Sequence, residues 1–445
     1  MSLILAQTAV QQNVKSTSEN PIIVLGAGMI GVTTALALQA RGQHVVIVDR
    51  KSAGRETSYG NAGVMQCDIA EPMAFPRSWA AVFNVALKRG ADVNYHWSAL
   101  PELAPKLAAY WRNSAPDRYA AICKDYFAII THSVKEHSHW VDAAGAGDLV
   151  QKTGYRHAYR TQAAFDTAVQ KAARFAREYG VIGEIHDRSA LLQAEPALYD
   201  NKGNAQSQPL IGAVHWAQPW NVSNPGELVA RYAALFLKNG GTIIQDDFLS
   251  LQQVNDSNLV PSTTTWTVKL ATQTLSAAHV VIATGPWADE TIRPLGYTLP
   301  LFVKRGYHQH FAGGAALNSP MLDAERGYVL APMAQGMRLT TGVEFAKLNA
   351  PQTPRQLVEA TAAARQLMNL PTPVEATPWL GCRPCTTDMR PIIGAAPSHK
   401  GLWFNFGHAH QGFTLGPASG RLIAELMTGE TPYINPTPYS AARFL

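Results

Sequence analysis

The sequence predicts an α/β protein with a Rossmann-like domain built from discontinuous segments and a second, α+β domain whose sheet is mixed or antiparallel. Three observations lead to this prediction. A strand, a glycine-rich turn, a helix and a second strand follow one another between residues 21 and 49. The same α/β pattern returns in the middle and at the end of the chain, and two blocks of different character separate these segments. With 445 residues and 47% apolar side chains, the chain can form two or more domains with sizeable cores.

The first predicted strand is the apolar, β-branched run from Ile22 to Leu25, which is typical of a buried parallel strand. The turn that follows reads Gly26-Ala27-Gly28-Met29-Ile30-Gly31, and a helical pattern then continues to Gly42. The first glycine permits the tight turn, the second lets a diphosphate approach the backbone, and the third lets the helix pack closely against the strand. The N-terminus of the helix faces the diphosphate.

A second predicted strand, His44 to Val48, ends at Asp49, and Arg50 follows it. An acidic side chain at this position accepts hydrogen bonds from both hydroxyls of an adenosine ribose. The glycine motif alone is weak evidence, but the strand, helix, second strand and terminal acid occur here in the correct order. Together they predict that the segment binds a dinucleotide.

The remaining elements follow in two blocks. Residues 72–207 are predicted to be mostly helical because apolar residues recur there at i, i+3 and i+4, most clearly over 79–87, 103–111, 127–141 and 165–179. The α/β pattern then returns with a helix over 228–237, strands over 242–245 and 279–283, and a polar hairpin tip over 256–265. Short β-like runs with a helix near 357–368 occupy residues 294–375, and a helix over 416–427 closes the chain.

These blocks predict the division into domains. Residues 1–20 are a polar leader, and residues 21–75, 221–292 and 381–445 form the dinucleotide-binding domain. Residues 76–220 and 293–380 form the second domain, which is expected to bind the substrate.

Composition excludes several classes of protein. The net charge is +5, but no run of lysine or arginine is longer than a pair, which argues against nucleic-acid binding. Four cysteines cannot form a disulfide framework, and Cys382 and Cys385 lack a second pair of metal ligands, so no metal site is expected. The apolar run from Leu3 to Ala6 is too short for a signal peptide, and no stretch is long enough to span a membrane. The sequence therefore predicts a cytoplasmic protein.

Four signatures together resemble the FAD-dependent D-amino-acid oxidase superfamily. The first is the N-terminal turn. The second is Glu56-Thr57-Ser58-Tyr59-Gly60-Asn61-Ala62-Gly63, and the third is the strand end Val281-Ile282-Ala283-Thr284-Gly285. The fourth joins Gly381-Cys382-Arg383-Pro384 to Gly407-His408-Ala409-His410-Gln411-Gly412 and the closing helix. The Ser-x-Gly-Asn-Ala-Gly variant of the second signature resembles bacterial D-amino-acid dehydrogenases, and the likeness extends over nearly the whole chain from Pro21.

The resemblance implies a D-amino-acid oxidase or glutathione-reductase-like fold and non-covalently bound FAD, because Cys382 is one position away from the register of covalent relatives. It implies that the cofactor contacts residues of all four signatures, namely Gly26, Gly28, Met29, Ile30, Gly31, Asp49, Arg50, Ser58, Asn61, Ala62, Gly63, Thr284, Gly285, Gly407, His408, Gly412, Phe413 and Thr414.

The resemblance also implies a substrate site. Arg383 stands where the family's arginine holds the substrate carboxylate, and a planar guanidinium is suited to that task. Tyr328 resembles the tyrosine whose hydroxyl meets the same carboxylate. His410 occupies the place of a second substrate-facing residue in some relatives, although a structural histidine explains it equally well. Gly306 would allow close approach to the flavin, with Tyr307 or His308 beside the pocket.

The implied activity is FAD-dependent oxidative deamination of D-amino acids to 2-oxo acids and ammonia, with a hydride passing from the α-carbon to the flavin. Electrons would then pass to a quinone or another acceptor. The alternatives are the same chemistry on secondary amino acids (D-proline or hydroxyproline-like compounds, sarcosine) or on glycine, and an FAD-binding subunit of an electron-transfer complex. An NAD-dependent dehydrogenase is favoured by the first signature alone. The aromatic-rich block from Phe75 to Trp111 would suit peripheral contact with the inner membrane, and ordinary core helices explain it as well.

Overall fold

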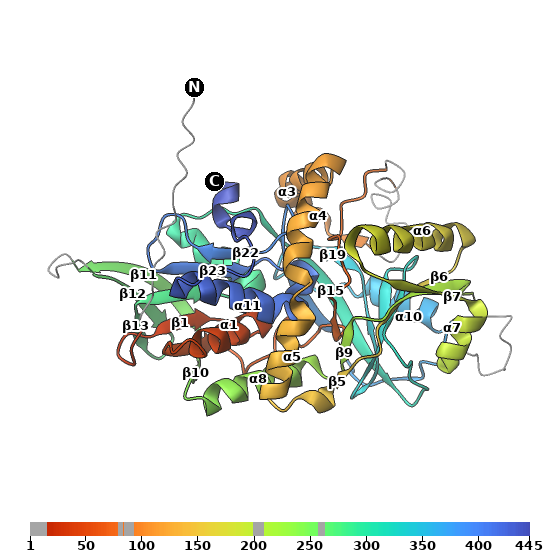
Figure 1. The fold of residues 1–445 in the computed structure, drawn as a ribbon, viewed down its shortest axis with the longest axis horizontal. Helices are drawn as coiled ribbons and strands as arrows, with labels where there is room; N and C mark the ends of the chain where they lie inside the picture. The colour runs from red at the N-terminus through yellow and green to blue at the C-terminus, as the bar shows by residue number, and fades with distance from the viewer. Residues whose placement is uncertain (1–15, 79–82, 84–92, 199–208, 257–262) are drawn as a thin grey trace, which may run out of the picture.

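The computed structural model describes residues 16–78, 83, 93–198, 209–256 and 263–445 (Figure 1). Most of the leader, most of the predicted helix over 79–87 and the tip of the predicted hairpin lie outside the described residues. The predicted α/β class is confirmed, because a largely parallel sheet at one end of the molecule adjoins a mixed sheet at the other (Figure 1).

The first sheet has six strands in the order β10-β2-β1-β14-β23-β22, and all neighbours are parallel except β22. Its strands come from the start, the middle and the end of the chain: β1 (Ile22–Leu25), β2 (Val45–Asp49), β10 (Thr242–Gln245), β14 (His279–Ile282), β22 (Ile392–Ala395) and β23 (Leu402–Phe406). All four residues of β1 are buried, as expected for a strand that is covered on both faces. The strand order confirms the prediction that this sheet is assembled from three separate segments of the chain.

The two faces of this sheet bury alternate residues. Ile22 and Val24 contact the helices on one face, and Ile23 and Leu25 contact a three-stranded antiparallel sheet on the other. The helices on the first face include α1 (Met29–Gln39), α5 (Ser133–Ala143), α8 (Pro225–Lys238) and α11 (Gly412–Thr428). The antiparallel sheet consists of β11 (Phe248–Asp256), β12 (Thr263–Leu270) and β13 (Thr274–Ala277).

The second sheet has eleven strands, and most of its neighbouring pairs are antiparallel, so the predicted mixed sheet is confirmed. Its members are β4 (Val93–Tyr95), β6 (Tyr155–Tyr159), β7 (Gly183–Asp187), β8 (Gly212–Trp216), β15 (Leu301–Ala312), β16 (Met321–Asp323), β17 (Tyr328–Met333), β18 (Gly336–Thr340), β19 (Val343–Phe345), β20 (Thr372–Pro373) and β21 (Trp379–Thr386). A small sheet of β3 (Val64–Met65), β9 (Trp220–Val222) and β5 (Val150–Gln151) lies apart from both.

The remaining helices are α3 (Leu100–Asn113), α4 (Pro116–Ile130), α6 (Gln162–Tyr179), α7 (Arg188–Ala194), α9 (Ala288–Ile292) and α10 (Arg355–Ala364). The helix predicted over 127–141 is therefore two helices, α4 and α5, that meet near Thr131. Strands β4, β5, β6 and β7 interrupt the block that was predicted to be mostly helical. Strand β7 is largely exposed, so no alternating apolar pattern marks it in the sequence.

Contacts cross the predicted domain boundaries in two places. Helices α4 and α5 belong to the range predicted for the second domain, yet Ile129 and Trp140 pack in the same hydrophobic cluster as α11. Strand β21 contains the first residues of the last predicted dinucleotide-binding segment, yet it pairs with β15 of the second sheet. The end of β21 consequently joins the two sheets at the cavity described next.

Candidate active site

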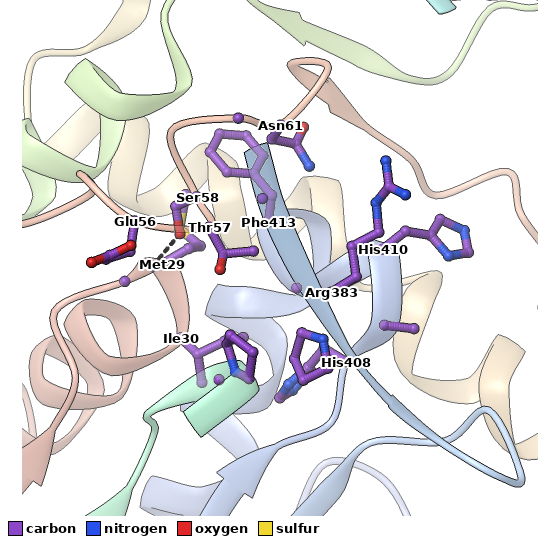
Figure 2. A pocket seen from close by; sticks show the side chains of 18 of the residues that line it. Met29, Ile30, Glu56, Thr57, Ser58, Asn61, Arg383, His408, His410 and Phe413 are labelled. Carbon is purple, nitrogen blue, oxygen red and sulfur yellow. Dashed lines mark hydrogen bonds between the residues drawn. The ribbon is translucent and has the colours of Figure 1, made fainter. Parts of the chain in front are cut away.

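A cavity of about 700 Å³ lies between the two large sheets and receives residues from both. Its walls include the β1–α1 turn and the carboxyl ends of β2 and β14, where ligands bind in open α/β sheets. Strands β15, β17 and β21 of the second sheet form the opposite wall. Figure 2 shows Met29, Ser58 and Glu56 on one side of this cavity, and Arg383 and His410 on the other.

The β1–α1 turn has the geometry that its glycines predicted. Gly26 has φ +111°, and a Cβ on it would lie 2.5 Å from the Ala283 carbonyl oxygen. A Cβ on Gly31 would lie 1.8 Å from the Gly26 carbonyl oxygen. Gly28 caps α1 without a side-chain hydrogen bond and lines the cavity together with Met29 and Ile30. The Met29 amide donates to Ser58, so the next amide of α1, that of Ile30, is the one available to an anion at the cavity, whereas Gly31 does not line the cavity and serves the packing of helix on strand.

Asp49 stands at the end of β2 and lines the cavity. One carboxylate oxygen accepts a hydrogen bond from the Ala27 amide (2.6 Å) and the other from the Lys51 amide (2.9 Å). Burial raises the pKa of the Asp49 carboxyl above its usual value, and these two amides oppose that shift. The two amide bonds orient the carboxylate, and each oxygen keeps a further lone pair for a ribose hydroxyl. Arg50 also lines the cavity and stacks 4.2 Å from the centre of the Trp287 ring.

The second signature forms a loop along the cavity wall. Ser58 accepts a hydrogen bond from the Met29 amide (3.0 Å), which ties the loop to the start of α1 (Figure 2). Asn61 and Ala62 line the cavity. Gly63 does not line it. Its φ is +71°, and a Cβ added to it would lie 2.3 Å from the Val222 carbonyl oxygen, so the close approach of the two segments requires glycine. The loop is thus fixed at both ends and exposes its middle to the cavity.

The third and fourth signatures complete this part of the wall. Thr284, Gly285, Gly407, His408, Gly412 and Phe413 line the cavity. Thr414 does not, because its hydroxyl donates to the Val64 carbonyl (3.3 Å). His408 is buried, and burial lowers its pKa to about 3, so the ring is neutral at pH 7. Its Nε2 has no hydrogen-bond partner among the described residues, which is what a site for a bound polar group shows in the absence of that group.

Arg383 extends from β21 along the opposite wall. Its Nη1 donates to the Gly342 carbonyl (2.9 Å) and its Nη2 to the Thr341 carbonyl (3.3 Å). Within the described residues it forms no ion pair with a carboxylate, and burial lowers its pKa. A half-buried guanidinium with no counter-ion that faces a cavity is suited to bind an anionic ligand.

His410 lines the cavity near Arg383 (Figure 2). Burial lowers its pKa to about 3, and the charges of Arg383 and Lys304 lower it further. His410 is therefore neutral at pH 7 and contributes a hydrogen-bonding group rather than a second positive charge.

Lys304 on β15 is a cavity residue that sequence reasoning missed. Only 9% of the residue is exposed, and its Nζ donates to the Tyr110 hydroxyl (3.1 Å). The sequence carried one signal, since a lysine interrupts the apolar run Leu301-Phe302-Val303 of a predicted strand.

The structure does not bring Tyr328 to the cavity, which corrects its predicted place beside the substrate carboxylate. Successive residues of a strand face opposite sides, and on β17 Val329 lines the cavity whereas Tyr328 packs in the core behind it. The Tyr328 hydroxyl lies 3.5 Å from Nη2 of Arg160. Of the two neighbours on β15, Tyr307 lines the cavity, and His308 does not but stacks on Trp379.

The two cysteines of the C-x-x-C sequence are free thiols. Cys382 does not line the cavity, and burial raises its pKa to about 11. The thiol is consequently protonated at neutral pH, which does not favour a covalent link to a cofactor.

Comparisons with known proteins agree with this geometry. The family of FAD-dependent oxidoreductases matches residues 21–426. The D-amino-acid oxidase of Bradyrhizobium diazoefficiens is 26% identical over 435 residues, which cover 95% of this chain and 99% of that protein. The D-amino acid dehydrogenase of Dechloromonas aromatica is 26% identical over 430 residues, with 92% and 97% covered. The crystal structure of glycine oxidase from Geobacillus kaustophilus superposes with a TM-score of 0.68 at 20% identity, covering 96% of this chain and all of that one.

The fold and the cavity thus define a flavoprotein of the D-amino-acid oxidase type. The chain belongs to the family of FAD-dependent oxidoreductases, and it is an amino-acid oxidoreductase with FAD as its cofactor. No helix in the described part of the chain is both long and apolar enough to cross a membrane.

Proposed function

We propose that the chain is an FAD-dependent D-amino-acid dehydrogenase that deaminates its substrates to 2-oxo acids and ammonia. The observation that carries this proposal is the half-buried guanidinium of Arg383, which has no carboxylate partner among the described residues and faces the same cavity as the dinucleotide-binding turn. The D-amino-acid specificity is supported by the names of the relatives at 26% identity.

The residues of the first sheet would hold the cofactor. The Ile30 amide at the start of α1 would take its diphosphate, and Asp49 would take the adenosine ribose. The loop around Ser58 and Asn61 and the turn with His408 would enclose the remaining part of FAD. FAD supplies the redox chemistry when bound, because it accepts a hydride from the substrate α-carbon.

Arg383 would bind and orient the amino acid. Two of its N–H groups are engaged by the carbonyls of Thr341 and Gly342, which hold the guanidinium in one plane and leave other N–H groups for the α-carboxylate. Loss of hydride from the α-carbon and of a proton from the neutral amine gives the imino acid. Water then adds to the imino carbon, and ammonia leaves with formation of the 2-oxo acid. The protein contributes orientation and exclusion of water rather than a nucleophile.

The electron acceptor is proposed to be a quinone, reached by peripheral contact with the inner membrane. Support comes from the aromatic-rich block from Phe75 to Trp111, in whose described part Phe83, Trp97 and Trp111 are exposed. The guanidinium of Arg77 lies 4.1 Å from the Trp111 ring, and tryptophan next to a cation is typical of membrane interfaces. Flotation with anionic liposomes tests this contact: wild type should float, and a Trp97→Ser/Trp111→Ser variant should remain at the bottom. Wild type that remains at the bottom would contradict it.

A second candidate is oxidation of secondary amino acids or glycine by the same site, since the fold is also that of glycine oxidase. A non-catalytic FAD-binding subunit is the third. Turnover of the purified holoprotein with an artificial dye separates these functions. D-alanine should yield pyruvate and ammonia in equal amounts. Turnover of sarcosine or D-proline alone would indicate the second function, and no turnover of any amino acid would indicate the third.

A further inference from the structure

Two positive charges oppose each other across the β15–β21 pair. Lys304 and Arg383 are Cα partners in the antiparallel register, and both line the cavity. Neither forms an ion pair with a carboxylate within the part of the chain that the structure describes. Like charges at directly opposite positions destabilise a sheet, and buried charges require partners. The position of these two cations without an acidic partner is therefore unfavourable unless a ligand neutralises them.

The two side chains diverge from their shared position. The guanidinium of Arg383 reaches across Gly306 to the carbonyls of Thr341 and Gly342. The ammonium of Lys304 reaches the opposite way and lies 4.4 Å from the centre of the Tyr110 ring. The wall formed by β15 and β21 thus has two separate cationic positions, and the charges of both lower the pKa of His410.

The neighbouring residue on β15 provides a comparison. Arg305 is completely buried and faces away from Lys304, and its Nε forms an ion pair with Glu344 at 2.9 Å. The chain therefore supplies an acidic partner to Arg305 outside the cavity but none to Lys304 and Arg383 on its wall. A ligand with two anionic groups would supply both missing partners.

We propose that Lys304 binds a second acidic group of the substrate, so that the preferred substrates are dicarboxylic amino acids. This inference rests on the proposed function, in which Arg383 binds the α-carboxylate. A short carbon chain between the carboxylates would place one on each cation, because the two side chains start from paired positions and end at different contacts.

Binding of inert carboxylates to the holoenzyme tests the inference without turnover. Succinate and butyrate have equal carbon chains but two and one carboxylates, and their binding is followed by the visible spectrum of the flavin. Wild type should bind succinate at least tenfold more tightly than butyrate. Lys304→Met should abolish this preference and Lys304→Arg should retain it. The exposed Lys269 provides the matched control, since Lys269→Met should leave the preference unchanged.

Equal binding of succinate and butyrate by wild type would overturn the inference, and so would a preference that survives in Lys304→Met. The proposed function is tested separately by butyrate alone. If butyrate binds equally to wild type and to Arg383→Met, the proposed function fails. If Arg383→Met loses butyrate while wild type shows no preference for succinate, only the inference about Lys304 fails.

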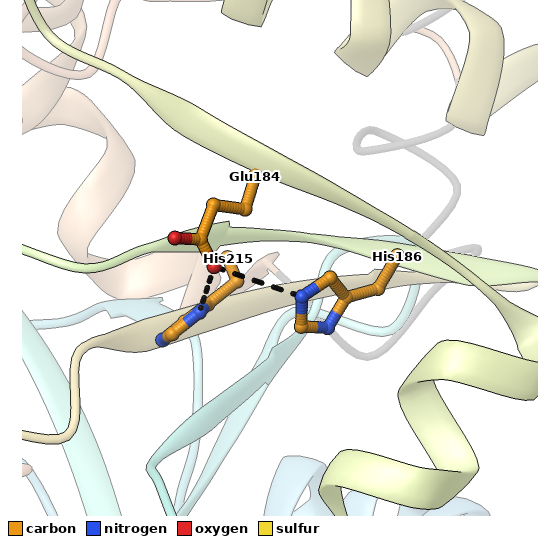
Figure 3. A group of neighbouring side chains, drawn as sticks. All are labelled: Glu184, His186 and His215. Atoms are coloured by element: carbon orange, nitrogen blue, oxygen red, sulfur yellow. Dashed lines mark hydrogen bonds and ion pairs between the residues drawn. The ribbon is translucent and has the colours of Figure 1, made fainter.

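A different observation concerns the far end of the second sheet, where Glu184, His186 and His215 converge (Figure 3). Glu184 and His215 are paired across β7 and β8, and His186 follows on the same face of β7. Oε2 of Glu184 lies 3.1 Å from Nδ1 of His215 and 3.7 Å from Nε2 of His186. Donor atoms that each bind a tetrahedral zinc ion at about 2.0–2.1 Å are separated by about 3.3 Å.

The hydrogen bond of His215 to the backbone determines which ring nitrogen faces Glu184. Its Nε2 lies 3.1 Å from the Thr153 carbonyl oxygen, which can only accept, so Nε2 carries the proton. The lone pair of Nδ1 in the neutral ring then faces the Glu184 carboxylate. By contrast, His310 in the cluster with His308 and Glu375 has both nitrogens satisfied, because Nδ1 donates to Glu375 and Nε2 accepts from Nε of Arg338 (2.9 Å). His308 in that cluster has no hydrogen-bond partner among the described residues, but His310 offers no free lone pair, so its three side chains cannot all bind one ion.

We infer that Glu184, His186 and His215 bind a divalent transition-metal ion of the zinc class, a site that the sequence did not predict. The Thr153 carbonyl would orient His215 as a hydrogen-bond partner of a metal-bound histidine commonly does. The nearby cation Arg156 does not oppose the ion with a free charge, because it is paired with the buried Glu195.

Calorimetric titration of the full-length holoprotein with Zn²⁺ tests this site. Wild type should bind one ion, and His215→Asn and His186→Asn should each weaken binding at least tenfold. The exposed His139 is the matched control, since His139→Asn should bind as wild type does. Wild type that binds no zinc would overturn the site, and so would binding that persists unchanged in His215→Asn, because a simple His215–Glu184 ion pair would then account for the contact.

Discussion

Gly306 lies directly beneath Arg383: a Cβ on Gly306 would stand 2.6 Å from Nη2 of the guanidinium. No side chain can therefore be added to Gly306 without displacing the group that is proposed to bind the substrate carboxylate. This contact joins a backbone position on β15 to a side chain on β21, and it leads to the first prediction.

Gly306→Ala should raise KM for D-alanine at least tenfold while FAD remains bound, because the methyl group displaces Arg383 from the carbonyls of Thr341 and Gly342. Steady-state kinetics and the flavin content of the purified variant measure the two effects. Gly314→Ala, just after the end of β15, is a poor control because its Cβ would clash with backbone, whereas Gly147, with open space around its Cβ position, is suitable. An unchanged KM in Gly306→Ala would contradict the described position of Arg383.

Arg383→Met should lower kcat/KM by a factor of about 30 to several thousand, since truncating one partner of a buried charge pair costs about 2–5 kcal/mol. FAD content should be preserved, because Arg383 lies across the cavity from the dinucleotide-binding turn (Figure 2). Kinetics with a dye acceptor and the ratio of flavin to protein absorbance provide the two readouts. Kinetics equal to those of wild type would refute the role of Arg383.

Tyr328→Phe should change KM by less than twofold, because the hydroxyl lies near Arg160 and outside the cavity. Val329→Trp at the neighbouring, cavity-facing position should reduce kcat/KM strongly by filling the cavity. Side-by-side kinetics of the two variants decide between the two faces of β17. A large rise in KM for Tyr328→Phe would restore the role implied by the family resemblance.

Asp49→Ala should weaken FAD binding, by roughly 1–3 kcal/mol, because it removes the acceptor for the ribose hydroxyls and leaves the Ala27 amide unpaired. Fluorescence titration of the FAD-free protein gives the dissociation constant. Asp246→Ala removes a nearby cavity-lining carboxylate at the end of β10 and serves as the comparison. Equal dissociation constants for wild type and Asp49→Ala would contradict the proposed place of the ribose.

Acid should destabilise the FAD-free protein through its buried histidines. The pKa of His408 is lowered to about 3 in the folded state, so the unfolded chain binds the proton more readily below pH 6.5. Its stabilising contribution is complete above pH 6.5 and is lost as the pH falls toward 3, by about 1.4 kcal/mol per pH unit. Urea unfolding at pH 7 and pH 5 measures the loss of unfolding free energy on acidification. This loss should be smaller for His408→Gln than for wild type, and the same as in wild type for the exposed His139→Gln. An identical loss in His408→Gln and wild type would contradict this.

Local patterns in the sequence were enough to predict the elements whose conformation is determined by residues close to them in the chain. The run Ile22–Leu25, the glycines after it and the strand ending at Asp49 form the predicted unit because each step is determined within a few residues. Strand β7 escaped prediction because it lies at a sheet edge with both faces largely exposed, so its residues need no apolar alternation.

The site was predicted less completely because it depends on register and on pairing between distant segments. A shift of one residue turns a strand side chain to the opposite face, which is why Val329 rather than Tyr328 reaches the cavity. Lys304 is recognised as a site residue only from its pairing with Arg383 across two strands, and no local sequence motif predicts such a pair.

The most direct test of the proposed function is an anaerobic visible spectrum of the purified holoprotein before and after addition of D- or L-amino acids. Bleaching of the yellow flavin by D-amino acids, and not by their L-enantiomers, is the result we predict, with dicarboxylic D-amino acids acting at the lowest concentrations. A flavin that L-amino acids alone bleach, or that no amino acid bleaches, would contradict the proposal that this chain is a D-amino-acid dehydrogenase.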